Sequence, residues 1–292
     1  MNNMIFIIIF IHIFIFGLIC GFLFEPFLYH SDKKNTDTTR SSRIFITGDK
    51  HRNFKNVKKY CKRKKTTVDD VLIIVGDCGL NYYLDNRDTR LKRRLSKIKI
   101  TLFCIHGNKE CRPEEVGSYG IKSFSGGRVY YEPSFPNILF AIDGEMYCFN
   151  NHKYMVIGGA HSVDKNRSII NGSPYWPSEL PTVETKDRII DSLKRMNNEV
   201  YGFITHTCAK KYIPQEAFLS AREKNQNEIK MCEKRTVCDI NIPLDIDHSF
   251  EEWLGKIEED NNYAVWFCGH YHIDKKIDKT RMLFNDFEKM PD

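Results

Sequence analysis

The sequence lacks the short motifs that mark several common kinds of site. None of its ten cysteines lies in a C-x-x-C pair, which argues against zinc knuckles. There is also no H-E-x-x-H motif and no G-x-x-x-x-G-K-S/T loop, so zinc hydrolases of that type and P-loop enzymes are excluded. A chain of 292 residues, 41% of them apolar, does not need a disulfide scaffold. We therefore expect reduced thiols in a cytosolic compartment.

The chain also carries little excess charge. A net charge of +6 is mild for this length and does not require a nucleic-acid partner. With 41% apolar, 13% aromatic and 28% charged residues, the chain can bury a sizeable core, and a disordered, collagen-like or coiled-coil protein is excluded. The length fits two domains or, equally well, one large α/β domain.

Residues 4–24 form an apolar run without a formal charge, unlike the rest of the chain. The run is long enough to cross a bilayer as one helix, and it lacks the basic start of a secretory signal peptide. Basic residues follow it, which predicts a cytoplasmic C-terminal part. We expect a transmembrane anchor at 1–30, a polar linker at 31–42, and one domain at 43–292. The alternative is an extension created by a start codon placed too early, with a soluble cytoplasmic domain.

From residue 43 onward, short apolar runs alternate with amphipathic stretches. The predicted strands are 43–47, 71–75, 100–105, 201–205 and 264–268, and the predicted helices are 53–65, 87–97, 184–197 and 249–259. Near-continuous hydrophobicity is typical of strands buried on both faces, and the alternation predicts an α/β fold with a largely parallel sheet. Residues 128–159 instead have the pattern of antiparallel strands.

Polar residues follow each of the five predicted strands. They are Asp49, His51, Asp77, Asn108, His206, His270 and His272. Taken singly, a Gly-Asp pair is usually a turn and a lone histidine is usually packed or solvated. Because the carboxyl ends of parallel strands share one edge of a sheet, however, the whole set is expected to meet there. Carboxylate, amide and imidazole donors in this number suit two divalent ions that share one bridging carboxylate.

These blocks resemble the calcineurin-like metallophosphoesterase superfamily. The blocks are G-D-K-H at 48–51, G-D at 76–77, G-N-K-E at 107–110, the isolated His206, and G-H-Y-H at 269–272. The resemblance spans about residues 43–285, and the stretch 126–176, with G-G-A-H-S-V-D-K at 158–165, is similar to a small bacterial-type branch of metallophosphatases.

The resemblance implies a β-sandwich flanked by helices, with two metal ions at the strand ends. By the same resemblance, Asp49, His51 and His272 hold the first metal and Asp77 bridges both. The second metal is held by Asn108, His206 and His270. The metals would be Mn, Fe, Zn, Ni or Co, and a water that they activate would hydrolyse a phosphate mono- or diester.

Two residues depart from the family pattern. Lys109 stands where the family has a histidine that resembles a general acid, so Lys109, with Asn108 beside it, is the expected catalytic pair. Lysine keeps a positive charge that can bind phosphate but is a poorer proton donor than imidazole. A degenerate member that binds metal or nucleotide with little hydrolysis is therefore the alternative. Arg52 stands where the first block usually has glycine, and it either reaches the phosphate or crowds the loop.

Other residues are candidates for substrate or partner binding. His161 and Arg167 lie in a polar loop after a predicted strand and either contact substrate or cap the sheet. The basic runs at 58–65 and 92–94 suit nucleic acid or anionic lipid, or they are the solvated faces of two helices. The implied partners are thus a phosphoester substrate and a membrane reached through residues 4–24, while nucleic acid is not required.

Overall fold

The computed structural model describes residues 41–162, 172, 174–214 and 247–292. The chain divides into two units, Met1–Ser41 and Ser42–Asp292, and the fold below is that of the second. The predicted anchor at 4–24, nearly all of the linker, and Arg167 lie outside the described residues. Across the described ranges, none of the helices combines the length and the apolar character that crossing a bilayer requires.

The first of two sheets is built around four parallel strands. Its order is β13-β1-β2-β3-β6-β5-β4, with β1, β2, β3 and β6 parallel and the strands at both edges antiparallel to their neighbours. The strands are β1 Ile44–Thr47, β2 Val71–Ile74, β3 Thr101–Cys104, β4 Gly120–Phe124, β5 Gly127–Tyr131, β6 Ile138–Ala141 and β13 Phe287–Lys289.

The second sheet has the same plan. Its order is β11-β12-β10-β9-β8-β7, with β8, β9, β10 and β12 parallel and one antiparallel strand at each edge. The strands are β7 Met146–Phe149, β8 His152–Ile157, β9 Gly202–Thr205, β10 Val265–Cys268, β11 Lys275–Ile277 and β12 Thr280–Met282.

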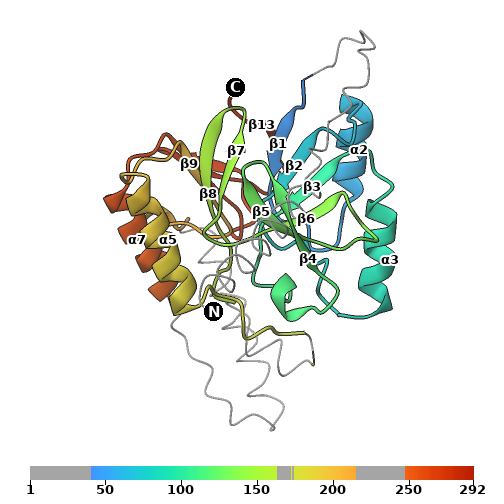
Figure 1. The fold of residues 1–292 in the computed structure, drawn as a ribbon, viewed down its shortest axis with the longest axis horizontal. Helices are drawn as coiled ribbons and strands as arrows, with labels where there is room; N and C mark the ends of the chain where they lie inside the picture. The colour runs from blue at the N-terminus through green and yellow to red at the C-terminus, as the bar shows by residue number, and fades with distance from the viewer. Residues whose placement is uncertain (1–40, 163–171, 173, 215–246) are drawn as a thin grey trace, which may run out of the picture. The chain divides into compact units, whose positions relative to one another are not determined.

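The sheets pack face to face, and helices cover their outer faces (Figure 1). Alternate residues of the same strands divide between layers: Ile73 lies in the core between the sheets, whereas Leu72 packs against the helices. The helices α2 Lys55–Lys64 and α3 Asn86–Leu95 cover the first sheet, and α5 Val183–Arg195 and α7 Ser249–Asp260 cover the second. Single 3₁₀ turns, η1 Pro113–Glu115 and η2 Lys210–Tyr212, lie in the connections.

The expected sandwich flanked by helices is confirmed, and so are the five predicted strands and four predicted helices, each to within two residues at its ends. The expectation that all five strands lie in one sheet was wrong. Strands β1, β2 and β3 belong to the first sheet, whereas β9 and β10 belong to the second. The predicted antiparallel region is also divided, because β5 and β6 pair in one sheet while β7 and β8 pair in the other. The site is therefore assembled from the ends of two facing sheets.

Candidate metal centre

The loops that leave the strand ends have a strained backbone at the residues expected to bind metal. His51, Asp77, His270 and His272 have φ values of 40°, 45°, 67° and 56°. Residues other than glycine seldom adopt positive φ, and such conformations persist where the surrounding structure imposes them, often at functional sites. The chain therefore turns sharply as it leaves β1, β2 and β10, and this brings the polar side chains close to the strand ends.

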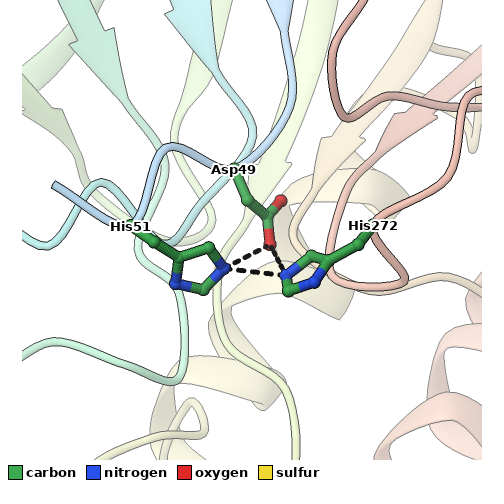
Figure 2. Close-up of side chains that lie close together, drawn as sticks. All are labelled: Asp49, His51 and His272. Atoms are coloured by element: carbon green, nitrogen blue, oxygen red, sulfur yellow. Dashed lines mark hydrogen bonds and ion pairs between the residues drawn. The ribbon is translucent and has the colours of Figure 1, made fainter. Parts of the chain in front are cut away.

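One group of donor atoms comes from Asp49, His51 and His272 (Figure 2). Asp49 Oδ2 lies 3.3 Å from His272 Nε2 and 3.7 Å from His51 Nε2, and the two histidine nitrogens are 2.7 Å apart. Asp49 Oδ2 is buried and has no hydrogen-bond partner among the described residues. A buried oxygen without a donor is costly unless a cation compensates it, so these residues fit a divalent metal ion.

A second group is formed by Asp49, Asp77 and His206. Asp77 Oδ1 lies 3.6 Å from His206 Nε2, and Asp77 Oδ2 lies 3.8 Å from His51 Nε2, so the two oxygens of this carboxylate face different groups. Asn108 Oδ1 is 3.0 Å from His206 Nε2. Asp77 therefore lies between two sets of O and N donors, as a bridging carboxylate would.

Hydrogen bonds behind the second group orient its donors. His206 Nδ1 donates to the carbonyl of Val75 at 2.8 Å, so in the neutral ring the Nε2 lone pair is the one that faces Asp77. Asn108 Nδ2 donates to Ser162 Oγ at 2.7 Å, which directs the amide oxygen toward His206. Partners of this kind fix the tautomer or rotamer of a metal ligand and support its affinity.

Replacing Ser162 by alanine removes the partner that orients the Asn108 amide. We expect the dissociation constant for Mn²⁺ to rise by about 10-fold, at the lower end of what outer partners of metal ligands contribute. Equilibrium titration of the metal-stripped protein with Mn²⁺ measures this dissociation constant. Ser96→Ala is the matched control, because the exposed Ser96 hydroxyl donates to the carbonyl of Arg93, away from the Asp/His groups. Equal affinities in the two variants would contradict the role given to Ser162.

The surroundings of the site lower the pKa values of Asp49 and His270. Burial raises the pKa of Asp49, but His206, His272 and His51 around it outweigh burial, so its pKa lies below the ordinary value. Burial, with the charge of His206, holds the pKa of His270 well below its ordinary value. The His270 backbone N–H also donates to Asp49 Oδ1 at 3.0 Å. Anionic carboxylate and neutral imidazole are the forms that bind metal ions.

Most of the chain matches one known protein family. Residues 42–274 match the family model described as calcineurin-like phosphoesterase. The chain belongs to the calcineurin-like phosphoesterase family. This membership confirms the resemblance derived from the sequence blocks, and together with the two Asp/His groups it supports a metal-dependent phosphoesterase activity.

Solved structures that are similar to this chain are distant in sequence. A protein described as TT1561 of Thermus thermophilus is 12% identical, with a TM-score of 0.44, and the match covers 86% of this chain and 99% of that one. The phosphopantetheinyl hydrolase of Mycobacterium tuberculosis is 13% identical, with a TM-score of 0.31, over 84% of this chain and 89% of that one. No curated protein matches this chain.

The two residues that depart from the family pattern have different surroundings. Lys109 is half-buried, its backbone N–H donates to Asp77 Oδ1 at 2.8 Å, and its charge contributes to the lowered pKa of His270. The charge of Lys109 therefore acts on His270 within the site. The Arg52 guanidinium instead forms an ion pair with Asp88 and donates to the carbonyl of Gly79 at 2.6 Å.

His161 lies in a separate acidic environment. Its ring nitrogens are 3.7 Å from Glu179 Oε1 and 3.5 Å from Asp247 Oδ2, and Glu179 is the main cause of its raised pKa. The neighbouring Ser162 N–H donates to Glu179 Oε2 at 3.2 Å. The substrate-binding roles of His161 and Arg52 stay predictions, and Arg167 lies outside the described residues.

Sequence reasoning gave no role to Glu110, although it is the last residue of the G-N-K-E block. Its carboxyl is fully buried and accepts the backbone N–H groups of Cys78 and Leu80, each at 3.1 Å. Burial, with the charge of Asp77, raises the pKa of Glu110 to about 8. Through these two hydrogen bonds, Glu110 stabilises the loop that carries Asp77. Ser162 was missed as well, because nothing in the local sequence pairs it with Asn108.

Proposed function

We propose that this chain is a phosphoesterase with two metal ions that hydrolyses phosphate mono- or diesters. The observation that carries the proposal is the placement of Asp77, whose two carboxylate oxygens face His51 on one side and His206 on the other. Asp49 belongs to both Asp/His groups, and Asp77 faces a histidine of each group, which suits a pair of divalent ions. When bound, such ions supply Lewis acidity that polarises the phosphate and lowers the pKa of water.

In this proposal, the residues divide between the ions as the family resemblance implies. Asp49, His51 and His272 hold one ion, Asp77 bridges, and the other ion is held by the donors Asn108, His206 and His270. Oxygen and nitrogen donors of this kind accept Mn, Fe, Zn, Ni or Co. The buried Asp49 carboxylate would contribute negative charge to the site of the first ion, and His206, whose Nδ1 donates to the carbonyl of Val75, would present Nε2 to the second.

The test of this function compares two chromogenic esters. The full chain is stripped of metal, supplied with Mn²⁺, and assayed with p-nitrophenyl phosphate and bis-p-nitrophenyl phosphate. We expect turnover that depends on metal, and the ratio of the two rates assigns the enzyme to monoesters or diesters. Turnover that is unchanged after metal has been stripped would contradict the proposal.

Lys109 is proposed to bind a phosphate oxygen with its ammonium group while it protonates leaving groups poorly. Its ordinary pKa is about 10.4, against about 6.5 for histidine, so imidazole is better matched to proton transfer near neutral pH. We expect Lys109→His to raise kcat for an alkyl phosphate by about 10-fold, with a smaller change for p-nitrophenyl phosphate, whose leaving group needs no proton. An unchanged or lower kcat for the alkyl ester would contradict this role.

Lys109 also supports the second candidate function, a degenerate member that binds metal or nucleotide with little hydrolysis. The two candidates predict the same metal binding but different turnover. Two bound metal ions with no hydrolysis of either chromogenic ester would favour the degenerate protein, and recovery of turnover in Lys109→His would identify the cause.

A further inference from the structure

A basic pocket lies on the outer side of the first sheet, at helix α3. It is an open hollow of about 450 Å³ lined by Arg52, Arg87, Arg90, Arg93 and Arg94. Arg52 comes from the loop after β1, and the other four arginines come from α3 itself. The pocket is distinct from the Asp/His groups, and neither metal binding nor the proposed hydrolysis uses it.

Two acidic side chains neutralise only part of this charge. Asp88 pairs with Arg52, and Asp85 pairs with Arg87, with its Oδ2 2.7 Å from Nη2. Arg90, Arg93 and Arg94 are exposed, and none of them forms a salt bridge within the described part of the chain. Since like charges repel, three uncompensated guanidinium groups around one hollow favour an anionic ligand there.

Two arginines of the pocket, Arg52 and Arg87, are held in place by their neighbours. The Arg52 guanidinium is 4.7 Å from the ring centre of Tyr83, and the Arg87 guanidinium is 3.4 Å from the same ring. Arg52 also donates to the backbone carbonyls of Gly79 and Arg87, which fixes its planar group. A guanidinium presents paired donors that match phosphate oxygens, and ordering it before binding reduces the entropy lost on binding.

One residue of the pocket follows a proposed metal ligand directly in the chain. Arg52 directly follows His51, so their Cα atoms are about 3.8 Å apart. We propose that the arginine pocket binds a second, non-scissile phosphate group of the substrate, so that the preferred substrates carry two or more phosphate groups. This inference rests on the proposed function, because the first phosphate would lie at the metal centre.

Inhibition of p-nitrophenyl phosphate hydrolysis tests the pocket. The full chain with Mn²⁺ is assayed with α,ω-alkanediol bisphosphates of several chain lengths and with alkyl monophosphates of the same lengths. For the best length, we expect the bisphosphate inhibition constant to be at least about 10-fold lower, as a charge-assisted phosphate contact predicts. If the bisphosphate inhibition constant is no more than about two-fold lower at every length, the statistical factor for two phosphate groups, while the enzyme turns over, the pocket proposal is overturned and the proposed function is not.

Two variants with the same loss of charge make the comparison specific. The first is the triple variant Arg90→Gln, Arg93→Gln and Arg94→Gln, and glutamine preserves helix propensity. The matched control is the triple variant Lys55→Gln, Lys58→Gln and Lys62→Gln on the exposed face of α2. In the arginine variant, the inhibition constant of the bisphosphate should be only about two-fold lower than that of the monophosphate, which is the statistical factor for two phosphate groups. In the lysine control, the difference of at least about 10-fold should persist.

Three further outcomes would also show whether the arginine pocket binds the second phosphate group. An advantage that survives in the arginine variant would place the second phosphate elsewhere and overturn the proposal. Binding of a single-stranded oligonucleotide that is lost in the arginine variant, without any preference for bisphosphates, would assign the pocket to nucleic acid instead. No turnover of either chromogenic ester would overturn the proposed function, and this inference with it.

Discussion

Replacing Asp77 by asparagine is expected to lower metal-dependent phosphoesterase turnover by about a thousand-fold or more while the protein stays folded. Loss of outer partners of metal ligands already costs about 10- to 100-fold, and Asp77 is proposed to touch both ions directly. The substitution is gentle for the fold, because asparagine tolerates the left-handed backbone that Asp77 adopts, with φ of 45°. The Oδ1 atom of asparagine can also still accept the Lys109 N–H that now bonds Asp77.

The measurement is kcat/KM with p-nitrophenyl phosphate at saturating Mn²⁺, together with the number of Mn²⁺ ions bound per chain. Asp69→Asn removes the same charge from an exposed position and should leave both quantities unchanged. An Asp77→Asn protein that keeps more than about a tenth of the turnover would show that this carboxylate is not a bridge, since even outer partners commonly matter more than that.

Replacing Gly76 by alanine is expected to damage both the site and the stability of the domain. Gly76 has φ of +108°, and a Cβ atom there would lie 1.9 Å from Nδ1 of the buried His206 ring. The ring cannot keep its hydrogen bond to the Val75 carbonyl and also make room. We expect a loss of about 3 kcal/mol in the free energy of unfolding and at least about a 100-fold fall in turnover, because a strained backbone and a displaced ligand act together.

Gly117→Ala is the control for this substitution, because a Cβ atom at Gly117 would have no neighbour within 4 Å among the residues that the structure describes. Thermal unfolding of the metal-free and Mn²⁺-loaded proteins separates the two effects. The metal-free Gly76→Ala protein should unfold about 6–12 °C below the parent, and added metal should raise its midpoint by less than it raises that of the parent. A variant as stable and as responsive to metal as Gly117→Ala would contradict this account of the β2 loop.

The buried strands could be predicted from the sequence because burial on both faces leaves a continuous apolar run. Val71–Ile74 and Val265–Cys268 have such runs, and each is followed at once by polar residues. Some edge strands were missed for the opposite reason. Lys275–Ile277 and Phe287–Lys289 are short and carry charged residues, as solvent-facing edge strands do.

The division into two sheets could not be derived from strand patterns alone. Parallel strands are joined by long crossovers, and a local run of apolar residues does not specify its neighbour. Val71–Ile74 pairs with β1 and β3, whereas Gly202–Thr205 pairs with β8 and β10, yet both are buried throughout. The family resemblance supplied the two-sheet arrangement, whereas the strand patterns had led to the expectation of one sheet.

The convergence of the candidate metal ligands Asp49, His51, Asp77, His206 and His272 could be predicted from their residue types and from their positions after the strands. Their supports could not, because those contacts join distant parts of the chain. Ser162 meets Asn108 across 54 residues, and Arg52 meets Asp88 across 36. The alternatives for Arg52 were phosphate binding or crowding of its loop. In the structure, Arg52 forms an ion pair with Asp88 and lines the arginine pocket.

The most direct test of the central claim is a titration of the metal-stripped full chain with Mn²⁺, in which bound metal and hydrolysis of p-nitrophenyl or bis-p-nitrophenyl phosphate are followed in the same samples. The account predicts that turnover rises with bound metal and saturates at two ions per chain. Turnover that is complete at one ion, or that needs no metal, would contradict a centre in which Asp77 bridges two ions.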